Sequence, residues 1–372
     1  MRLALQNLLH DRLRMVVTSL GVAFAVFLMI FQGSLLIGFV NAAGRIIEAT
    51  DSDLWIAPRG VVCFDFATAM DGRFEDIARG VAGVQSVDRL SVNFVDYRIP
   101  DGQQRIVVLV GADPHVGSRF PVPYLNGSQQ SVEPEAILLD ETSAKALDVH
   151  TVPSEVEING LRAHVAGTVS GFSSFLGSPY AFSSYEDAAR YSRTSSDKVA
   201  YLTVRVANGY DVESVRKKLA AELPEVNVWT RGEFERRSQL YWVGQTGAGA
   251  AILTAAVLAF LIGLVLVSQT VYATTLERVE EFATLKALGA SKGFIAMVVM
   301  VQALAFGVAG GVAGVLIAMP IVQIAQKAVA WIYMPVWLVA GVLVPAFAMC
   351  VLASVVSIRA AVSVEPARVF RA

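Results

Sequence analysis

The sequence predicts a membrane protein with four transmembrane α-helices and a large α+β extracytoplasmic domain inserted between the first and second helices. Two observations lead to this fold class. The 372 residues are 55% hydrophobic and only 17% charged, and the mean hydropathy is +0.54, which is too apolar for an ordinary soluble protein. The apolar residues also gather in four long segments, which leave a stretch of about 200 residues of mixed composition between the first two.

Each of the four segments is long enough to cross a hydrocarbon layer about 30 Å thick, which takes about 20 helical residues. They are residues 15–40, 248–272, 294–323 and 336–358, and none of them contains Asp, Glu, Lys or Arg. Pro320 and Pro345 are expected to bend the third and fourth segments. The first segment could be taken for a signal peptide, but its 26 residues exceed the apolar core of about 7–15 residues in a cleaved signal. We therefore expect a retained helix.

The distribution of charge predicts the orientation. The N-terminal segment, residues 1–14, and the tail, residues 359–372, each carry a net charge of +2, whereas the large domain, residues 41–247, has 20 Lys and Arg against 27 Asp and Glu. Short basic flanks stay in the cytoplasm, while long domains cross largely regardless of charge. We therefore expect both termini and residues 273–293 in the cytoplasm. The large domain and a short hairpin, residues 324–335, are expected on the other side.

The large domain is expected to mix strands with helices. Runs of β-branched and alternating apolar residues predict strands at residues 92–99, 105–110, 199–206 and 226–229. A hairpin is predicted over residues 155–167, because Asn159-Gly160 is the strongest short turn signal. Helices are expected at residues 74–81, 141–147, 185–191 and 211–223, the last capped by Asp211. Residues 232–245 are charged and then aromatic, and they are expected to continue into the second span, with Tyr241 and Trp242 at the membrane interface.

The most informative segment, ERVEEFATLKALGASK, occupies residues 277–292 between the second and third spans. Its apolar residues recur at helical spacing among charged ones, and Gly289 supplies a helix end. The members of this apolar stripe are Leu276, Val279, Phe282, Ala283 and Leu285. Composition leaves two interpretations open, a short amphipathic helix that docks onto another protein at the membrane surface or a solvated connecting loop.

The same segment resembles the cytoplasmic loop of the FtsX/MacB-like permeases of ABC exporters, in which an acidic and then basic helix ends in an Ala-Leu-Gly-Ala-Ser-like string. The tail RAAVSVEPARVFR, residues 359–371, resembles the C-terminal tail of that family. Three stretches are most similar to its DevC branch: SQTVYATTLERVEEFATLKALGAS (residues 268–291), FQGSLLIGF (residues 31–39) and DSDLWIAPRGV (residues 51–61). The resemblance runs along most of the chain and is weak in the middle of the large domain.

The resemblance implies the permease subunit of an ABC exporter that works by mechanotransmission, while a separate cytoplasmic ABC ATPase binds ATP and Mg²⁺ and hydrolyses the ATP. It implies that two permeases pair in the lipid bilayer and that a helix of each lies in a groove on the ATPase, with Phe282 and Leu285 on the docked face. The residues expected at this ATPase contact are Glu277, Arg278, Glu280, Glu281, Phe282, Leu285, Lys286, Leu288 and Gly289.

The resemblance also implies a location in the bacterial plasma (inner) membrane and further partners. In a double-membrane cell these are a periplasmic adaptor (membrane fusion protein) and an outer-membrane duct, and the cargo is lipid-like or amphiphilic. The alternative is a non-transporting, FtsX-like transmembrane regulator of a cell-envelope enzyme.

Small residues mark the second and third spans. The third contains two overlapping G-x-x-x-G patterns, and the second contains a stripe of small residues at helical spacing. Such faces let helices approach closely. They fit either a permease dimer interface or packing within one subunit, and the sequence leaves both open. The residues concerned are Gly307, Gly310, Gly311, Gly314, Ala255, Ala259 and Gly263.

The sequence lacks the motifs of a catalytic or metal site. It contains no G-x-x-x-x-G-K-[ST] phosphate-binding loop, its four histidines have no metal-ligand spacing, and no nucleophile-elbow pattern is present. Cys63 in the domain and Cys350 in the fourth span are expected to lie too far apart for a disulfide. We therefore expect no cofactor or metal on this chain, no catalysis of its own and no nucleic-acid partner.

Overall fold

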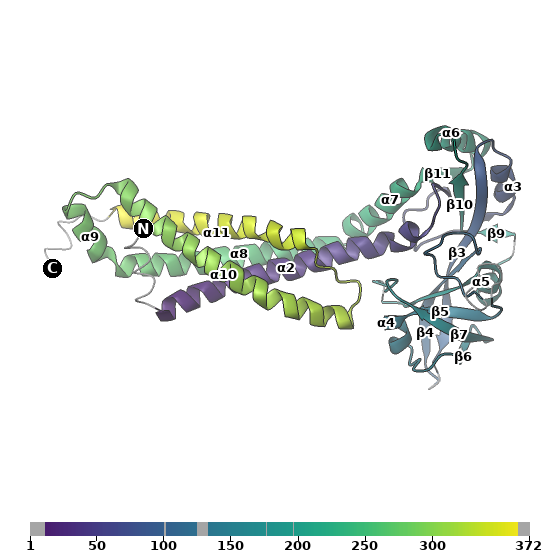
Figure 1. Cartoon of the computed structure of the whole chain (residues 1–372), viewed down its shortest axis with the longest axis horizontal. Helices are drawn as coiled ribbons and strands as arrows, with labels where there is room; N and C mark the ends of the chain where they lie inside the picture. Colours follow the sequence, from purple (N-terminus) through teal and green to yellow (C-terminus); the bar gives the residue numbers. More distant parts are fainter. Residues whose placement is uncertain (1–11, 100–101, 125–132, 176, 196, 364–372) are drawn as a thin grey trace. The chain divides into compact units, whose positions relative to one another are not determined.

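A computed structural model describes residues 12–99, 102–124, 133–175, 177–195 and 197–363 (Figure 1). The chain divides into two compact units. The helical unit comprises Met1–Ile37, Ala250–Lys327 and Ile332–Ala372, and the sheet unit comprises Gly38–Gly249 and Ala328–Trp331. The described residues contain four helices that are long and apolar enough to cross a membrane, and the α+β domain lies between the first and second. The predicted fold class is therefore confirmed.

The helices of the helical unit are longer than the predicted spans. They are α2 (Arg12–Ala49), α8 (Ala248–Glu277), α10 (Lys292–Ala328) and α11 (Val336–Ser363), with the short α9 (Val279–Ala287) between α8 and α10. Helix α10 continues through Pro320 and past the expected end at residue 323, and α11 continues through Pro345. Only the residues after Ala328 remain to connect α10 to α11, so the connection is shorter than the hairpin predicted from hydropathy.

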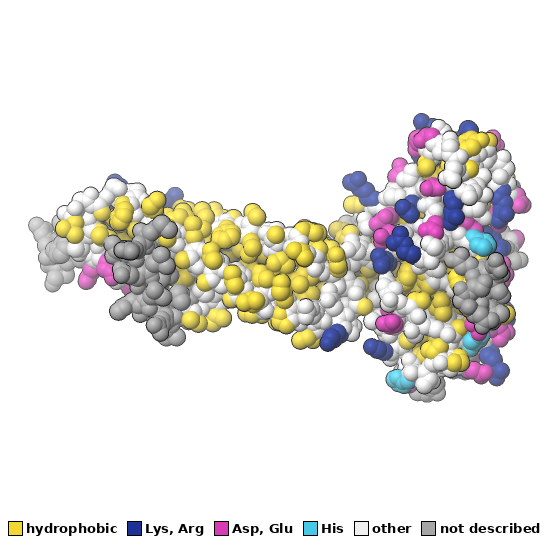
Figure 2. All heavy atoms as spheres, in the orientation of Figure 1, with side chains coloured by type: hydrophobic (Ala, Val, Ile, Leu, Met, Phe, Trp, Pro, Cys, Tyr) yellow, Lys and Arg dark blue, Asp and Glu magenta, His cyan; other side chains and the backbone are white. Residues whose placement is uncertain are grey.

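Apolar side chains form both the core and much of the visible surface of the helical unit (Figure 2). Buried members from α2, α8, α10 and α11 make one cluster, which includes Val26, Val267, Val299 and Met349. Lipid chains are as apolar as these side chains, so close packing rather than removal from water must hold such helices together.

The second span does not begin as a continuation of the helix before it. Helix α7 (Arg231–Gly244) ends at Gln245, and α8 begins at Ala248. Gly247 between them has a φ of +75°, which a right-handed helix cannot contain. The hydroxyl of Thr246 also donates a hydrogen bond to the carbonyl of Trp242 at 2.6 Å. Residues 232–245 therefore lead into the second span as predicted, but a three-residue break separates α7 from α8.

The sheet unit is built on a nine-stranded sheet with the order β11-β1-β10-β3-β4-β8-β5-β7-β6. Strand β3 is long and also pairs with β6, which closes the six strands from β3 to β6 in that order into a ring. The strands are β1 (Leu54–Pro58), β3 (Val84–Arg98), β4 (Gln104–Ala112), β5 (Ala136–Asp140), β6 (Ser154–Ile158), β7 (Leu161–Val169), β8 (Tyr180–Ser184), β10 (Tyr201–Val206) and β11 (Val226–Thr230), with β2 (Met70–Asp71) and β9 (Lys198–Val199) forming a separate pair.

The local signals in this unit were mostly reliable. The hairpin is confirmed, because β6 and β7 pair from Ile158 to Leu161 across Asn159 and Gly160, both of which have a positive φ. All four predicted helices are present as α3 (Arg73–Arg79), α4 (Glu141–Ala146), α5 (Tyr185–Ser192) and α6 (Val212–Glu222). Asp211 caps α6 as expected, since its carboxylate accepts from the backbone N–H of Ser214 at 2.9 Å.

Several strands had no sequence prediction. Strands β1, β5 and β8 were missed, and β3 begins well before the predicted start at residue 92. Strands β1 and β8 are short and buried along their whole length. They therefore lack the alternation that marks a half-buried strand.

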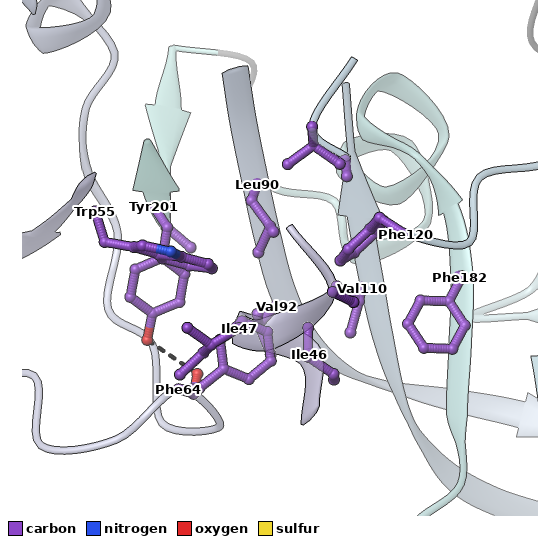
Figure 3. Packing of buried hydrophobic residues seen from close by; sticks show 14 of the residues in the cluster. Ile46, Ile47, Trp55, Phe64, Leu90, Val92, Val110, Phe120, Phe182 and Tyr201 are labelled. Atoms are coloured by element: carbon purple, nitrogen blue, oxygen red, sulfur yellow. Dashed lines mark hydrogen bonds between the residues drawn. The ribbon is translucent and has the colours of Figure 1, made fainter. Parts of the chain in front are cut away.

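Strand β1 carries two cores, one on each face of the sheet. Leu54 and Ile56 pack with residues of α3 and α6, whereas Trp55 and Ala57 pack on the other face with Phe234 of α7. This alternation follows from the two-residue period of a strand. Figure 3 shows the second core, in which the hydroxyl of Tyr201 donates to the carbonyl of Phe64 at 2.9 Å. The last turns of α2 enter the same core through Ile46 and Ile47.

Candidate functional site

Helix α9 is the structured part of the segment that the sequence singled out. Helix α8 extends to Glu277, and Arg278 separates it from α9 with φ −101° and ψ 18°. The carbonyl of Arg278 then accepts from the backbone N–H of Phe282 at 3.0 Å. Glu277 therefore belongs to the last turn of α8, and the expected single helix from residue 277 is corrected to two helices with a bend at Arg278.

The predicted helix end at Gly289 is confirmed. Gly289 has a φ of +93°, and its backbone N–H donates to the carbonyl of Lys286 at 3.0 Å. The N–H of Ala290 donates to the carbonyl of Leu285 at 2.9 Å. These two bonds are those of a Schellman motif, which needs the left-handed conformation that glycine adopts readily. Ser291 then starts α10, because its side chain accepts from the N–H of Phe294 at 3.2 Å.

The apolar face of α9 packs against the chain's own helices. Phe282 is only 3% exposed and Ala283 is fully buried. Phe282 shares its cluster with Val271 of α8 and Val299 of α10, and Leu285 packs against the same cluster. The ammonium of Lys286 donates to the carbonyl of Val362 in α11 at 2.5 Å. The expectation that Phe282 and Leu285 face a partner's groove is therefore corrected: this face is occupied, and it fastens α9 to three helices of the helical unit.

A second surface of α9 is exposed. Leu288 is 80% exposed, an unusual environment for a leucine next to a helix end. The outer face of α9, the name used from here on, consists of Glu280, Glu281, Thr284, Ala287 and Leu288. Glu277 at the end of α8 and Gly289 after α9 are exposed as well, whereas Arg278 and Lys286 are half-buried.

The small residues of the second and third spans lie against helices of the same chain. A Cβ atom placed on Gly310 would lie 2.4 Å from Cβ of Val22 in α2, and one on Gly314 would lie 2.7 Å from the carbonyl oxygen of Ala23. One placed on Gly307 would lie 2.9 Å from the sulfur of Cys350 in α11. Side chains cannot approach so closely, so these glycines let α10 contact α2 and α11.

The small residues of the second span also lie against helices of the same chain. A Cβ atom on Gly263 would lie 2.4 Å from Cβ of Ala25. Ala259 is buried, and Ala255 is half-buried. Gly311 is less crowded, with 3.4 Å to Leu343. Of the two interpretations that the sequence left open, the structure supports packing within one subunit.

In the sheet unit, α7 is held by a buried polar cluster that the sequence did not reveal. The carboxylate of Asp65, which is 2% exposed, accepts from the hydroxyl of Tyr180 at 2.5 Å and from the indole N–H of Trp242 at 2.9 Å. The backbone N–H of Phe64 donates to the hydroxyl of Ser238 at 3.1 Å. Residues distant in the sequence therefore fasten Ser238 and Trp242, one turn apart on α7, to the loop after β1.

Burial raises the pKa of the Asp65 carboxyl, and the hydrogen bonds from Tyr180 and Trp242 act in the opposite direction. Burial also raises the pKa of the neighbouring Cys63 thiol to about 11, so this cysteine is a buried thiol rather than a reactive one. The available signal for Asp65 was an acidic residue inside the otherwise apolar run VVCFDFA. An isolated carboxylate there must find donors within the fold.

The described residues contain no group of three or more His, Cys, Asp and Glu side chains arranged to hold a metal ion. Cys63 and Cys350 are both free and buried.

Comparisons with known proteins match both parts of the chain. Residues 15–222 match the family described as MacB-like periplasmic core domain, and residues 253–366 match the family described as FtsX-like permease C-terminal. The curated proteins give no match.

Two solved structures are similar to the chain in the region of the sheet unit. The periplasmic region of MacB from Actinobacillus actinomycetemcomitans is 14% identical, with 51% of this chain and 94% of that one covered and a TM-score of 0.39. The extracellular domain of the ABC-type transporter YknZ from Gram-positive bacteria is 15% identical, with 48% and 98% covered and a TM-score of 0.34.

Proposed function

Because the chain belongs to the family of MacB-like and FtsX-like permeases, whose members work with ABC ATPase partners, we propose that it is the transmembrane subunit of an ABC exporter. In this proposal a separate subunit binds ATP and Mg²⁺, and the chain itself is not catalytic. Both termini and α9 face the cytoplasm, and the sheet unit lies in the periplasm. The basic termini and the acidic large domain support this orientation.

The observation that carries the proposal is the two-sided character of α9. Its outer face exposes Leu288 among acidic side chains, which suits a contact with another protein. Its inner face is fixed to α8, α10 and α11 through Phe282 and Lys286. A partner that moves the outer face would therefore displace the helices behind it, and this is the property that a coupling helix requires.

The other end of α8 is also joined to a fastened helix. Helix α7 precedes α8 by a break of three residues and is anchored in the sheet unit by Asp65 and Ser238. In the proposed mechanism, closure of the ATPases displaces α9 and α8, and α7 transfers the displacement to the sheet unit. This is mechanotransmission, and it needs no hydrophilic channel through the four helices.

A homodimer is part of the proposal, with its interface away from the small-residue stripes. Those stripes are used inside the subunit, whereas α8 is the least buried of the four membrane helices. Its exposed aliphatic residues, among them Leu258, Leu261 and Val265, are available to a second copy. A periplasmic adaptor, an outer-membrane duct and a lipid-like cargo complete the proposal, supported by the resemblance to the DevC branch.

A regulator of a cell-envelope enzyme is the second candidate, and one observation favours it. Phe94 on β3 and Ile106 on the paired strand β4 are both about half exposed or more. Two large apolar side chains on adjacent strands suit a contact with a soluble protein. Such a protein would be the regulated enzyme in this reading, and the adaptor in the exporter reading.

Leu288→Asp tests the proposal, with Ile106→Asp as the matched control. Each replaces an exposed apolar residue by aspartate, so neither should affect folding. In reconstituted membranes with the partner ATPase, Leu288→Asp should abolish binding and stimulation of ATP hydrolysis, and Ile106→Asp should leave both intact. The purified chain alone should hydrolyse no ATP. Normal ATPase stimulation by Leu288→Asp would refute the coupling role of α9.

Two further comparisons separate the candidates. Reporters fused at the exposed turn residue Gly209 and at the C-terminus should report opposite sides of the membrane. Cells without the protein should retain a lipid that cells with the protein export. If no lipid or metabolite changes while Ile106→Asp removes the activity of a cell-envelope enzyme, the regulator is correct.

A further inference from the structure

The sheet unit contains a basic cavity beside the last turns of α2. Its volume is about 220 Å³. It is lined by Arg45, Glu48, Ala49, Arg119, Ser170 and Phe172. The lining therefore combines two arginines, one glutamate and one serine, all exposed, with Phe172, which is buried.

Arg45 is held in place but retains donors. Its Nε donates to the carbonyl of Gly171 at 3.2 Å, and its Nη1 donates to a carboxylate oxygen of Glu48 at 3.2 Å. These contacts use two of the five N–H donors of a guanidinium. Arg45 can thus accept a ligand without losing the bonds that orient it, which reduces the entropy lost on binding.

Arg119 makes the cavity positive overall. In the part of the chain that the structure describes, no hydrogen bond or ion pair fixes its guanidinium. It helps to hold down the pKa of Asp51, although the hydrogen bond from the backbone of Ser118 is the main cause. Among the lining residues two arginines stand against Glu48, so the lining itself has one excess positive charge, although Asp51 outside the lining partly offsets Arg119. A positive lining favours an anion.

The chemistry favours a phosphate group among anions. Guanidinium groups bind phosphate through paired, charge-assisted hydrogen bonds, and Ser170 adds a hydroxyl donor at the same wall.

The position along α2 indicates the source of the phosphate. Arg45 lies on the same uninterrupted helix as the first predicted span, five residues beyond its end at residue 40. At a rise of 1.5 Å per residue this is about 7–8 Å. The polar layer of a bilayer extends about 5–8 Å beyond the hydrocarbon on each side.

We propose that the Arg45–Arg119 cavity binds the phosphate group of an anionic ligand, supplied by the headgroup of a membrane lipid. The headgroup source rests on the proposed membrane function, whereas the phosphate chemistry does not. Bound lipid would fasten the end of α2 to the bilayer surface on the side of the sheet unit.

The test uses the full chain purified in a neutral detergent, titrated calorimetrically with dihexanoyl phosphatidylglycerol, with inorganic phosphate and with an uncharged dihexanoyl glycerol. Arg119→Gln and Arg45→Gln should each weaken phosphate-ligand binding about tenfold or more, as expected for loss of a charge-assisted hydrogen bond. Glu48→Gln should strengthen binding several-fold, because it removes the competing carboxylate. The matched control, Arg236→Gln at an exposed position of α7, should leave phosphate-ligand binding unchanged.

The outcomes are separable. Tighter binding of phosphatidylglycerol than of inorganic phosphate, lost in Arg119→Gln, supports the headgroup. Equal binding of the two supports a site for free phosphate. No phosphate-ligand binding, binding unaffected by Arg119→Gln, or weaker binding in Glu48→Gln would overturn the proposal. Stimulation of the ATPase is measured on the same variants. If the native chain does not stimulate the ATPase, the exporter function is refuted and the phosphate-binding result still stands.

Discussion

The two helices that flank α8 are anchored by opposite means. Helix α7 is held in the sheet unit by buried hydrogen bonds to Asp65 and Ser238, together with the aromatic side chain of Phe234. Helix α9 is held in the helical unit by the burial of Phe282 and Ala283, and Lys286 donates a hydrogen bond to the backbone carbonyl of Val362 in α11. The anchor of α7 includes a buried carboxylate that accepts two hydrogen bonds, whereas the anchor of α9 includes a buried aromatic ring.

The difference teaches how each anchor can fail. A buried hydrogen-bond network holds one geometry and loses much of its free energy when a single partner is removed. An apolar contact tolerates sliding but not the introduction of charge. We infer that α7 moves with the sheet unit as a rigid extension, while α9 can adjust its packing as it responds to a partner.

The largest expected effect comes from charging the apolar anchor. Phe282→Asp removes a buried ring, which alone costs about 3–5 kcal/mol, and adds the burial of a carboxylate. The protein should fail to accumulate in membranes. Leu288→Asp also replaces an apolar residue by aspartate, but at a residue that is 80% exposed. This variant should accumulate normally and should have the same unfolding temperature as the native protein. Normal accumulation and thermal unfolding of Phe282→Asp would show that α9 is not anchored by this ring.

Removal of the polar anchor should lower the free energy of unfolding somewhat less than Phe282→Asp does. Asp65→Ala leaves the hydroxyl of Tyr180 and the indole N–H of Trp242 without their acceptor, at a cost of about 2–4 kcal/mol. Asp65→Asn keeps an acceptor oxygen and should lose less stability than Asp65→Ala. Chemical unfolding of the full chain in detergent, followed by tryptophan fluorescence, measures both. Equal stability of the two variants would mean that the hydrogen bonds do not hold α7.

A third prediction separates packing within one subunit from packing between subunits. Gly310→Ala places a methyl group 2.4 Å from Cβ of Val22 and should lower the stability by about 1–3 kcal/mol. Gly311→Ala, one residue away and 3.4 Å from a flexible end of Leu343, should be tolerated. Thermal unfolding and light scattering are the measurements. If Gly310→Ala instead dissociates dimers without changing the unfolding temperature, the glycine stripe is an interface between copies.

A smaller effect concerns pH and the polar anchor alone. Burial raises the folded-state pKa of Asp65 above its ordinary 3.8. Its contribution to stability is therefore complete below the unfolded-state pKa and is lost as the pH rises through the folded-state value. The stability of the native chain relative to Asp65→Asn, measured by urea unfolding, should fall as the pH rises above the ordinary pKa of 3.8. A relative stability that rises with pH would contradict the effect of burial.

The smallest effects are expected at the helix ends. Thr230 and Glu233 form a capping box at the start of α7, and Thr230→Ala should cost about 1 kcal/mol. Gly289→Ala should cost a similar amount, about 1 kcal/mol, because Gly289 has a positive φ. Only Gly289→Ala should also reduce stimulation of the ATPase, since it lies beside Leu288. An equal effect of both variants on stimulation would remove the functional distinction between the two helices.

Local patterns predicted much of this molecule correctly. The four membrane helices follow from the absence of charge over each apolar segment, because a charge inside a bilayer is costly wherever the helix packs. The turn at Asn159-Gly160, the cap at Asp211 and the helix end at Gly289 were predicted because each depends on the conformational preference of one or two residues. Strands β1 and β8 were missed, because a fully buried strand shows no alternation.

The sequence by itself determined that the segment before Gly289 forms a helix with an apolar stripe, because helical period and glycine conformation are properties of neighbouring residues. Only the tertiary structure decided what covers that stripe, because an apolar side chain has the same affinity for any apolar surface that reaches it. The chain's own α8 and α10 reach Phe282 first, so the outer face with Leu288 is the surface left for a partner. The acceptor role of Asp65 likewise depends on Tyr180 and Trp242, which only the fold brings to it.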